Sequence, residues 1–163
     1  MIEKTEFVAW IEGKHEMLYR VARTILRNDE DCKDALQSAV LKAWENRRKL
    51  RDAKLFGTWL TRILINECHA LRRKNSKYLL QDEVADTAVS RAPDPALQQA
   101  LEGLPERLRL PLTLHYLGGY TYEEIAGMLR LPQSTVRSRL SKARGALRMA
   151  LEADKEAWLH EAQ

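Results

Sequence analysis

The stretch TYEEIAGMLRLPQSTVRSRLSKARGAL, residues 121–147, contains the signals of two helices joined by a short turn. Thr121 and Glu124 stand three residues apart, the spacing of a capping box, in which each side chain accepts the backbone amide of the other residue. We therefore expect a helix from Thr121 to about Leu129. Pro132 is expected to open the next helix, because proline is tolerated in the first turn. Together these signals predict a helix-turn-helix.

The first helix of this pair is predicted to bury a small apolar face. Ile125, Ala126 and Leu129 recur at helical spacing. The small side chains of Ala126 and Gly127 are expected to let the second helix approach closely at a steep angle.

The second helix of the pair has one apolar side and one basic side. Val136, Leu140, Ala143 and Leu147 recur at helical spacing and are expected to pack inward. The other positions carry hydroxyls and cations without an acid, which suits a DNA major groove, where cations meet phosphates and donors meet base edges. A helix face that contacts only water usually mixes both charges, so we favour DNA binding over a solvated cationic helix. The candidate DNA-binding residues are Gln133, Ser134, Thr135, Arg137, Ser138, Ser141, Lys142 and Arg144.

Upstream of this stretch the sequence predicts two further helices, preceded by a linker. Helical patterns cover residues 96–102 and 106–117, separated by Gly-Leu-Pro and ended by a pair of glycines. Between residues 76 and 95 the apolar periodicity fades, acids appear, and Pro93-Asp94-Pro95 breaks any helix. We expect this segment to be a flexible linker.

The N-terminal part of the chain predicts three helices. Apolar residues recur at helical spacing over residues 17–26, 35–44 and 56–71, and Asn28-Asp29 supply a stop and cap signal between the first two helices. A basic segment, residues 47–54, precedes the third helix. The exposed side of that helix carries a polar stripe, which could contact DNA or only solvent; its members are Arg62, Asn66, His69 and Arg73.

These elements predict an all-α fold with two small helical domains joined by a flexible linker. A chain of 163 residues accommodates two such units. We expect the first domain in residues 1–75, the linker in residues 76–95, and the second domain, with its helix-turn-helix, in residues 96–163. The net charge of +4 and the pI of about 9.1 favour a polyanionic partner.

Several classes of site are disfavoured by the sequence. Cys32 and Cys68 lie far apart without metal-ligand spacing, and the four histidines are scattered, so we expect no metal and no other cofactor. No paired carboxylates, phosphate-binding glycine loop or nucleophile constellation is present, which argues against a nucleic-acid enzyme. No apolar run approaches the roughly 18 residues that span a bilayer, and the N-terminus lacks the apolar core of a signal peptide. We therefore expect a cytoplasmic protein with no membrane insertion.

Three segments, in this order, resemble bacterial RNA polymerase sigma factors of the extracytoplasmic-function (ECF) class of the sigma-70 family. They are LYRVARTILRNDEDCKDALQSAVLKAWENRRKL, LFGTWLTRILINECHALRRK and GGYTYEEIAGMLRLPQSTVRSRLSKARGALR. Within the last segment, STVRSRLSKARGALR is close to the family's usual TVKSRLxRARxxLR. The resemblance implies a subunit that binds core RNA polymerase and directs promoter recognition and DNA-templated transcription initiation, without catalysis by this chain.

The resemblance also implies a role for each domain. The first domain would be sigma region 2, which binds core polymerase and opens the minus-ten element, and the second would be region 4, which reads the minus-thirty-five element through the candidates between residues 133 and 144. The loop at residues 49–57 matches the family segment that holds an extruded base. The implied minus-ten residues are Lys49, Arg51, Lys54, Arg62, Asn66, His69 and Arg73.

The family's core-binding helix matches the second predicted helix of the first domain. The residues carried over by position are Asp34, Gln37, Lys42 and Trp44, whereas Ser38 departs from the family pattern, which commonly has an acid there. Core RNA polymerase and promoter DNA are thus the expected partners, together with an anti-sigma factor that masks one or both domains.

Two alternatives stay open at this stage. A stand-alone helix-turn-helix regulator, whose first domain senses a signal or dimerises, would share the same DNA-binding helix. Trp59 could lie against nucleic acid, but its spacing relative to Phe56, Leu60 and Ile63 favours a place in the core.

Overall fold

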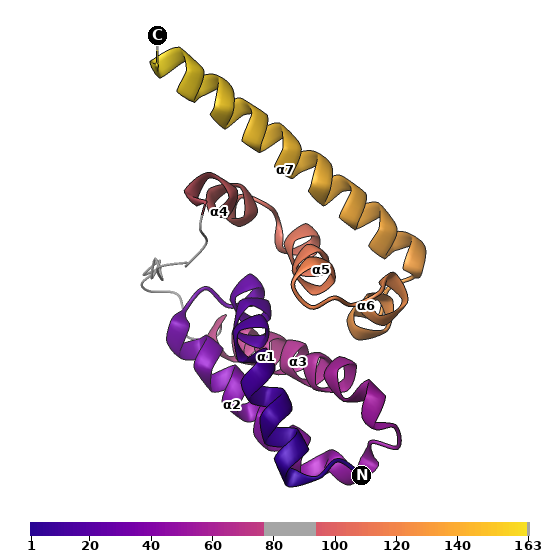
Figure 1. The fold of residues 1–163 in the computed structure, drawn as a ribbon. Helices are drawn as coiled ribbons and strands as arrows, with labels where there is room; N and C mark the ends of the chain where they lie inside the picture. Colours follow the sequence, from indigo (N-terminus) through magenta and orange to yellow (C-terminus); the bar gives the residue numbers. More distant parts are fainter. Residues whose placement is uncertain (77–93, 163) are drawn as a thin grey trace.

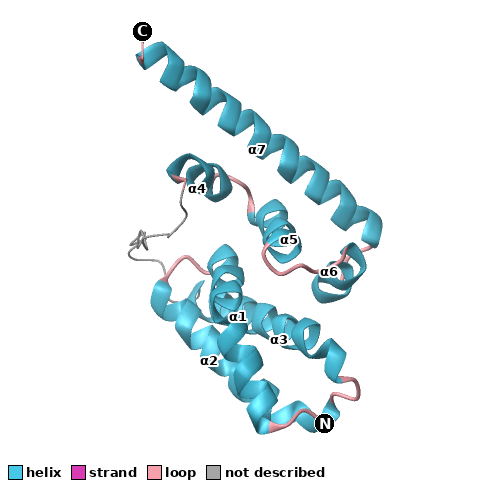
Figure 2. Cartoon of the chain, viewed as in Figure 1, coloured by secondary structure: helices cyan, strands magenta, loops and turns pink. Residues whose placement is uncertain are grey.

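The computed structural model describes residues 1–76 and 94–162 and consists, in these ranges, of helices joined by short loops (Figures 1 and 2). The prediction of an all-α fold is therefore confirmed. Residues 77–93 of the predicted linker lie outside the described residues. The α-helices are α1 (Lys4–Ile25), α2 (Asp29–Asn46), α3 (Phe56–Ser76), α4 (Pro95–Glu102), α5 (Glu106–Tyr116), α6 (Tyr122–Leu129) and α7 (Gln133–Glu161), with short 3-10 helices at η1 (Arg47–Lys49) and η2 (Ala53–Leu55).

Helices α1, α2 and α3 pack together as the first helical unit. Leu18 on α1, Ala39 on α2 and Leu64 on α3 are fully buried where the three helices meet. The cap predicted between the first two helices is present, because the Asn28 side chain accepts the Asp31 amide at 3.3 Å. Such a side-chain acceptor satisfies one of the free amides at a helix start.

Helices α4 to α7 form the second unit, and its helix-turn-helix is α6 and α7. The Thr121 amide donates to the Glu124 carboxylate at 2.8 Å and the Glu124 amide donates to the Thr121 hydroxyl at 3.1 Å, so the predicted capping box is confirmed. Arg130 ends α6 in the left-handed conformation, with φ of 56°. Pro132 was expected in the first turn of the next helix; it is the N-cap residue, one position before the first residue of α7.

The predicted role of Gly127 is wrong. A Cβ built on Gly127 would meet no atom within 4 Å, because this position faces solvent. Ile125 is fully buried and Ala126 is half-buried, and both pack in the apolar cluster that includes Val136 and Leu140 of α7.

The last helix is longer than the sequence pattern indicated. Helix α7 continues to Glu161 and projects past the other helices (Figure 1). Its buried residues Val136, Leu140 and Ala143 all lie in the N-terminal half, and Trp158 near its end is 65% exposed. The N-terminal half of α7 is therefore the part held by the domain.

The two helical units pack against each other. Helix α5 lies against α1, and α6 lies against α3. The buried apolar residues of both units form one continuous cluster. This contact is not apparent in the local sequence patterns, which predicted two domains joined only by a linker.

Within the described ranges, no helix has both the length and the apolar composition needed to cross a membrane. The same residues contain no group of three or more His, Cys, Asp and Glu side chains placed to hold a metal ion.

Candidate nucleic-acid interface

A hollow of about 470 Å³ lies between α5 and the start of α7. Arg107 and Leu108 come from α5, and the α7 residues are Ser134, Thr135, Ser138, Arg139 and Lys142. Three cations and three hydroxyls thus surround the hollow, and no acid lines it. Cations and hydroxyl donors in this arrangement can hold a DNA phosphate backbone.

Four of the α7 residues predicted from the sequence meet at this hollow, and three lining residues were missed: Arg107, Leu108 and Arg139. Arg107 was missed because it lies on α5, which the sequence pattern presented only as a supporting helix. Arg139 lies between the apolar and the polar faces of α7, where it is half-buried. A helical projection that asked which cations flank the polar face could have found Arg139.

The other predicted residues of α7 lie outside the hollow. Gln133, Arg137 and Ser141 are exposed. Arg144 is half-buried and donates to the Tyr116 hydroxyl at 3.3 Å. Hydrogen bonds to Tyr116 and Tyr122 raise the pKa of the Arg144 guanidinium. Arg144 therefore hydrogen-bonds to the aromatic side chains beside it and does not line the hollow.

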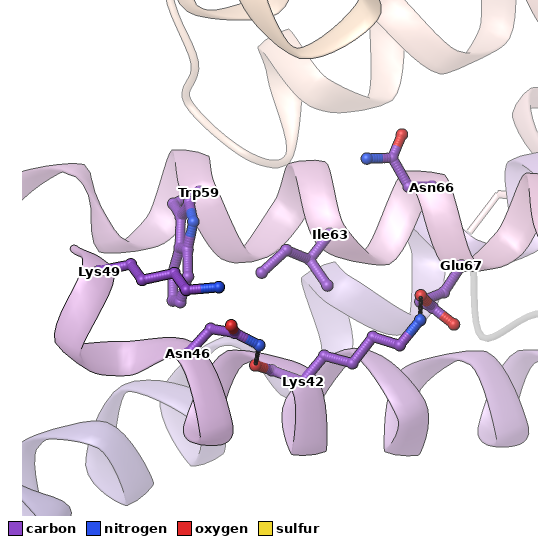
Figure 3. A pocket seen from close by; sticks show the side chains of 7 residues that line it. All are labelled: Lys42, Asn46, Lys49, Trp59, Ile63, Asn66 and Glu67. Carbon is purple, nitrogen blue, oxygen red and sulfur yellow. Dashed lines mark hydrogen bonds and ion pairs between the residues drawn. The ribbon is translucent and has the colours of Figure 1, made fainter.

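A second hollow, of about 340 Å³, lies between α2 and α3 in the first unit (Figure 3). Its lining residues are Lys42, Asn46, Lys49, Trp59, Ile63, Asn66 and Glu67. Lys42 pairs with Glu67 across the two helices, and the Asn46 amide donates to the Lys42 carbonyl at 2.8 Å. An aromatic ring, two amide side chains and the Lys49 ammonium, beside the Lys42–Glu67 ion pair, thus surround one opening, a combination suited to a nucleotide base.

The sequence left open whether Trp59 lies in the core or against nucleic acid, and its position in the structure is compatible with both. Its ring packs against the buried Phe56 with centroids 6.2 Å apart, and it also lines the second hollow. The ring therefore contacts the core on one side and remains available to a ligand on the other.

The predicted minus-ten residues outside this hollow fall into two groups. Arg51, Lys54, Arg62 and Arg73 are exposed on the α2–α3 loop and on α3. His69 belongs to the same stripe as Arg62, yet its Nε2 lies 3.3 Å from a carboxylate oxygen of Glu106 on α5. The polar stripe thus exists as predicted, and one of its members contacts the second unit.

The outer face of α2 carries part of the predicted core-binding set. Asp34 and Gln37 are exposed on it, and Leu41, which the sequence analysis did not select, is 56% exposed between them and the end of the helix. Lys42 turns toward the second hollow. Trp44 is half-buried and packs edge-on against Phe7, with centroids 5.1 Å apart. The structure thus does not gather all four predicted residues into one exposed patch.

Both cysteines are buried and free. Burial raises the pKa of the Cys32 thiol and of the Cys68 thiol to about 12. Thiols of this kind are protonated at neutral pH and make poor nucleophiles.

Comparison with known proteins assigns both units. Family models described as "Sigma-70 region 2" and "Sigma-70, region 4" match residues 10–78 and 95–147. The chain is 36% identical over 138 residues to the ECF RNA polymerase sigma factor SigM of Mycobacterium tuberculosis, covering 82% of this chain and 70% of that protein. It is 30% identical over 171 residues to the RNA polymerase sigma-H factor of Pseudomonas aeruginosa, covering 87% and 83% of the two chains.

Two solved structures share the fold. The sigma factor RpoE from Bartonella quintana, in complex with the anti-sigma factor NepR, matches with a TM-score of 0.75 and 24% identity, over 91% of this chain and 98% of that chain. CnrH, in complex with the cytosolic domain of CnrY, matches with a TM-score of 0.64 and 21% identity, over 93% and 91% of the two chains.

Proposed function

This chain belongs to the ECF class of sigma-70 RNA polymerase sigma factors, and we propose that its two domains divide promoter recognition between two separate surfaces. As a sigma factor it binds core RNA polymerase and directs promoter recognition and transcription initiation. The main support for two separate surfaces is the pair of hollows, one in each domain, that are lined by side chains suited to nucleic acid.

The second domain is proposed to bind the minus-thirty-five element. The hollow between α5 and α7 offers Arg107, Arg139 and Lys142 to phosphates. Exposed side chains beside it, such as Gln133 and Arg137, can reach base edges. The helix-turn-helix geometry supports this proposal, because the second helix of that motif enters the major groove.

The first domain is proposed to bind the minus-ten element as a single strand. An unstacked base fits the hollow between α2 and α3, where it can stack on Trp59 and reach the amides of Asn46 and Asn66. Exposed cations can then contact phosphates along the DNA strand; they are Lys49, Arg51, Lys54, Arg62 and Arg73.

The outer face of α2 is proposed to contact core polymerase. Asp34 and Gln37 supply polar contacts there, and the exposed Leu41 adds an apolar one. Ser38 lies on the same face in place of the family's acid, so we expect the apolar contact to matter more in this chain.

The chemistry of RNA synthesis is assigned to the polymerase, and we propose that this chain is not itself a catalyst. It would act in the cytoplasm, where core polymerase and promoter DNA are. An anti-sigma partner is proposed because RpoE and CnrH, which share its fold, were solved in complexes with NepR and CnrY.

The test of this proposal is reconstituted transcription. Core polymerase is combined with genomic promoter fragments, with and without the purified chain. We expect specific start sites only when the chain is present. A chain that binds promoter DNA alone and leaves the start sites of polymerase unchanged would instead be a stand-alone regulator.

A further inference from the structure

Among the described residues, four polar contacts join the second domain to the first. The hydroxyls of Tyr120 and Thr61 lie 2.8 Å apart, and both residues are buried. Arg109 Nη2 donates to the Thr24 carbonyl at 2.9 Å. Glu106 pairs with Arg72 and with His69 on α3. The contact is therefore selective, because each pair joins complementary groups.

Gly57 of the first domain lies beside Tyr120. A Cβ at Gly57 would lie 3.4 Å from the Tyr120 hydroxyl and 2.9 Å from Trp10 Cζ2. The close approach of Trp10 requires a residue without a Cβ at this position, whereas 3.4 Å to the Tyr120 hydroxyl is an ordinary contact distance. Gly57 thus lets Trp10 pack closely beside the place where Tyr120 meets the first domain.

Glu106 lies at the edge of the proposed minus-ten surface. At 100° per residue, the stripe that includes Arg62, Asn66 and His69 runs along α3 between the second hollow and the side that holds Thr61 and Arg72. The Glu106 carboxylate contacts the stripe at His69. A carboxylate here competes with a DNA phosphate for His69 and repels a phosphate that approaches the stripe.

We propose that the free chain is autoinhibited at its minus-ten surface, with Glu106 standing where the backbone of the promoter strand would pass. This inference rests on the proposed function of the first domain. The recognition side of α7 stays uncovered, since Gln133, Arg137 and Lys142 are exposed. Docking of the second domain therefore closes one of the two DNA surfaces and leaves the other open.

The packed arrangement of the two domains contains an unsatisfied hydrogen-bond donor that would reach water if the domains separated. Arg109 is half-buried, and among the described residues its Nε has no hydrogen-bond partner. Buried donors without a partner are costly, and exposure to water removes that cost. The closed state is thus held by a few selective contacts and opposed by one unsatisfied donor, as suits a contact that polymerase must separate.

The experiment measures single-stranded DNA binding by the free full-length chain. The probe is a fluorescent oligonucleotide that carries the minus-ten sequence mapped from transcripts made with the wild-type chain. The test variants are Glu106→Gln, which removes the charge, and Tyr120→Phe, which removes the buried hydroxyl pair without changing charge. The control is Glu123→Gln, because Glu123 is an exposed acid in the first turn of α6, away from these contacts. Small-angle scattering follows domain separation.

We expect Glu106→Gln and Tyr120→Phe each to raise the affinity by about 3- to 10-fold and to increase the radius of gyration, since each shifts the closed–open equilibrium. Glu123→Gln should change the affinity less than about 2-fold, as a distant surface charge does. The proposal is overturned if Glu106→Gln raises the oligonucleotide affinity no more than Glu123→Gln does. It is also overturned if Tyr120→Phe leaves both the affinity and the radius of gyration at wild-type values.

Transcription with core polymerase separates this inference from the proposed function. Wild-type chain that yields no promoter-specific transcripts would refute the proposed function. Specific transcripts from the wild type and from both variants, with equal oligonucleotide affinities of the three free chains, would refute autoinhibition alone.

Discussion

The two proposed nucleic-acid surfaces of this sigma factor are built differently. The surface of the second domain lies mostly on one helix, α7, with two residues added from α5. The surface of the first domain combines the end of α2, the following loop and α3, and its edge also contacts the second domain. A surface on one helix depends only on its own domain, whereas a composite surface with a shared edge can be regulated by whatever covers that edge.

The largest expected effect comes from removing the support of α7. Leu140 is fully buried beneath the recognition side. Leu140→Ala should cost about 2 to 5 kcal/mol of unfolding free energy, through lost burial and a residual cavity. Denaturant unfolding measures this loss, with the exposed Met149→Ala on the same helix as control. If each surface depends on its own domain, this variant loses duplex binding and keeps single-stranded binding; loss of both would break the contrast.

The composite surface is probed at Trp59. Trp59→Leu keeps an apolar side chain against Phe56 but removes the ring from the hollow. Single-stranded minus-ten DNA should bind about 1 to 3 kcal/mol more weakly, which is the usual worth of base stacking on an aromatic side chain. Fluorescence anisotropy gives the affinity. Unaltered binding would show that the hollow does not hold a base, and weakened binding of minus-thirty-five duplex would show that the substitution acts through folding.

A smaller effect is expected at the surface on α7. Lys142 lines the hollow between α5 and α7, and Lys142→Ala should remove one phosphate contact. The slope of log affinity against log salt should then fall by about 1. Arg148→Ala is the matched control, because Arg148 is an exposed cation of the same helix outside the hollow. Equal salt slopes for Lys142→Ala and the wild type would remove this residue from the interface.

The smallest effect at neutral pH is that of the two buried thiols. Each has a pKa near 12 in the folded chain, because of burial, against 9.0 as the ordinary value. The raised folded-state pKa stabilises the fold below about pH 9 and this stabilisation is lost as pH rises toward 12. Unfolding free energies at pH 8 and pH 10 should therefore differ more for the wild type than for Cys32→Ala/Cys68→Ala. If the difference between pH 8 and pH 10 is the same for the wild type and the double variant, the thiols ionise as readily in the folded chain as in the unfolded chain.

Local interactions account for the parts of this fold that were predictable. Thr121 and Glu124 are three residues apart, so the start of α6 could be located from those two residues and the chain around them. Val136 and Leu140 repeat at helical spacing and define the buried side of α7 in the same way. The position of the polar stripe on α3 followed from the same periodicity.

Contacts between distant segments could not be predicted from these patterns. His69 meets Glu106 across 37 residues of chain, and Thr61 meets Tyr120 across 59. Arg107 lines the proposed DNA-binding hollow only because α5 packs on α7. Helical periodicity tells which side of a helix is buried, but not which helix covers it.

The division of promoter recognition between two surfaces is tested most directly by footprinting promoter complexes formed with core polymerase. DNase protection reports the minus-thirty-five contact, and permanganate reactivity of unpaired thymines reports opening at minus ten. We predict that Lys142→Ala weakens upstream protection at raised salt while thymines still open in the complexes that form, and that Trp59→Leu keeps upstream protection and loses thymine reactivity. Equal loss of both signals in both variants, or loss of neither, would contradict two separate surfaces.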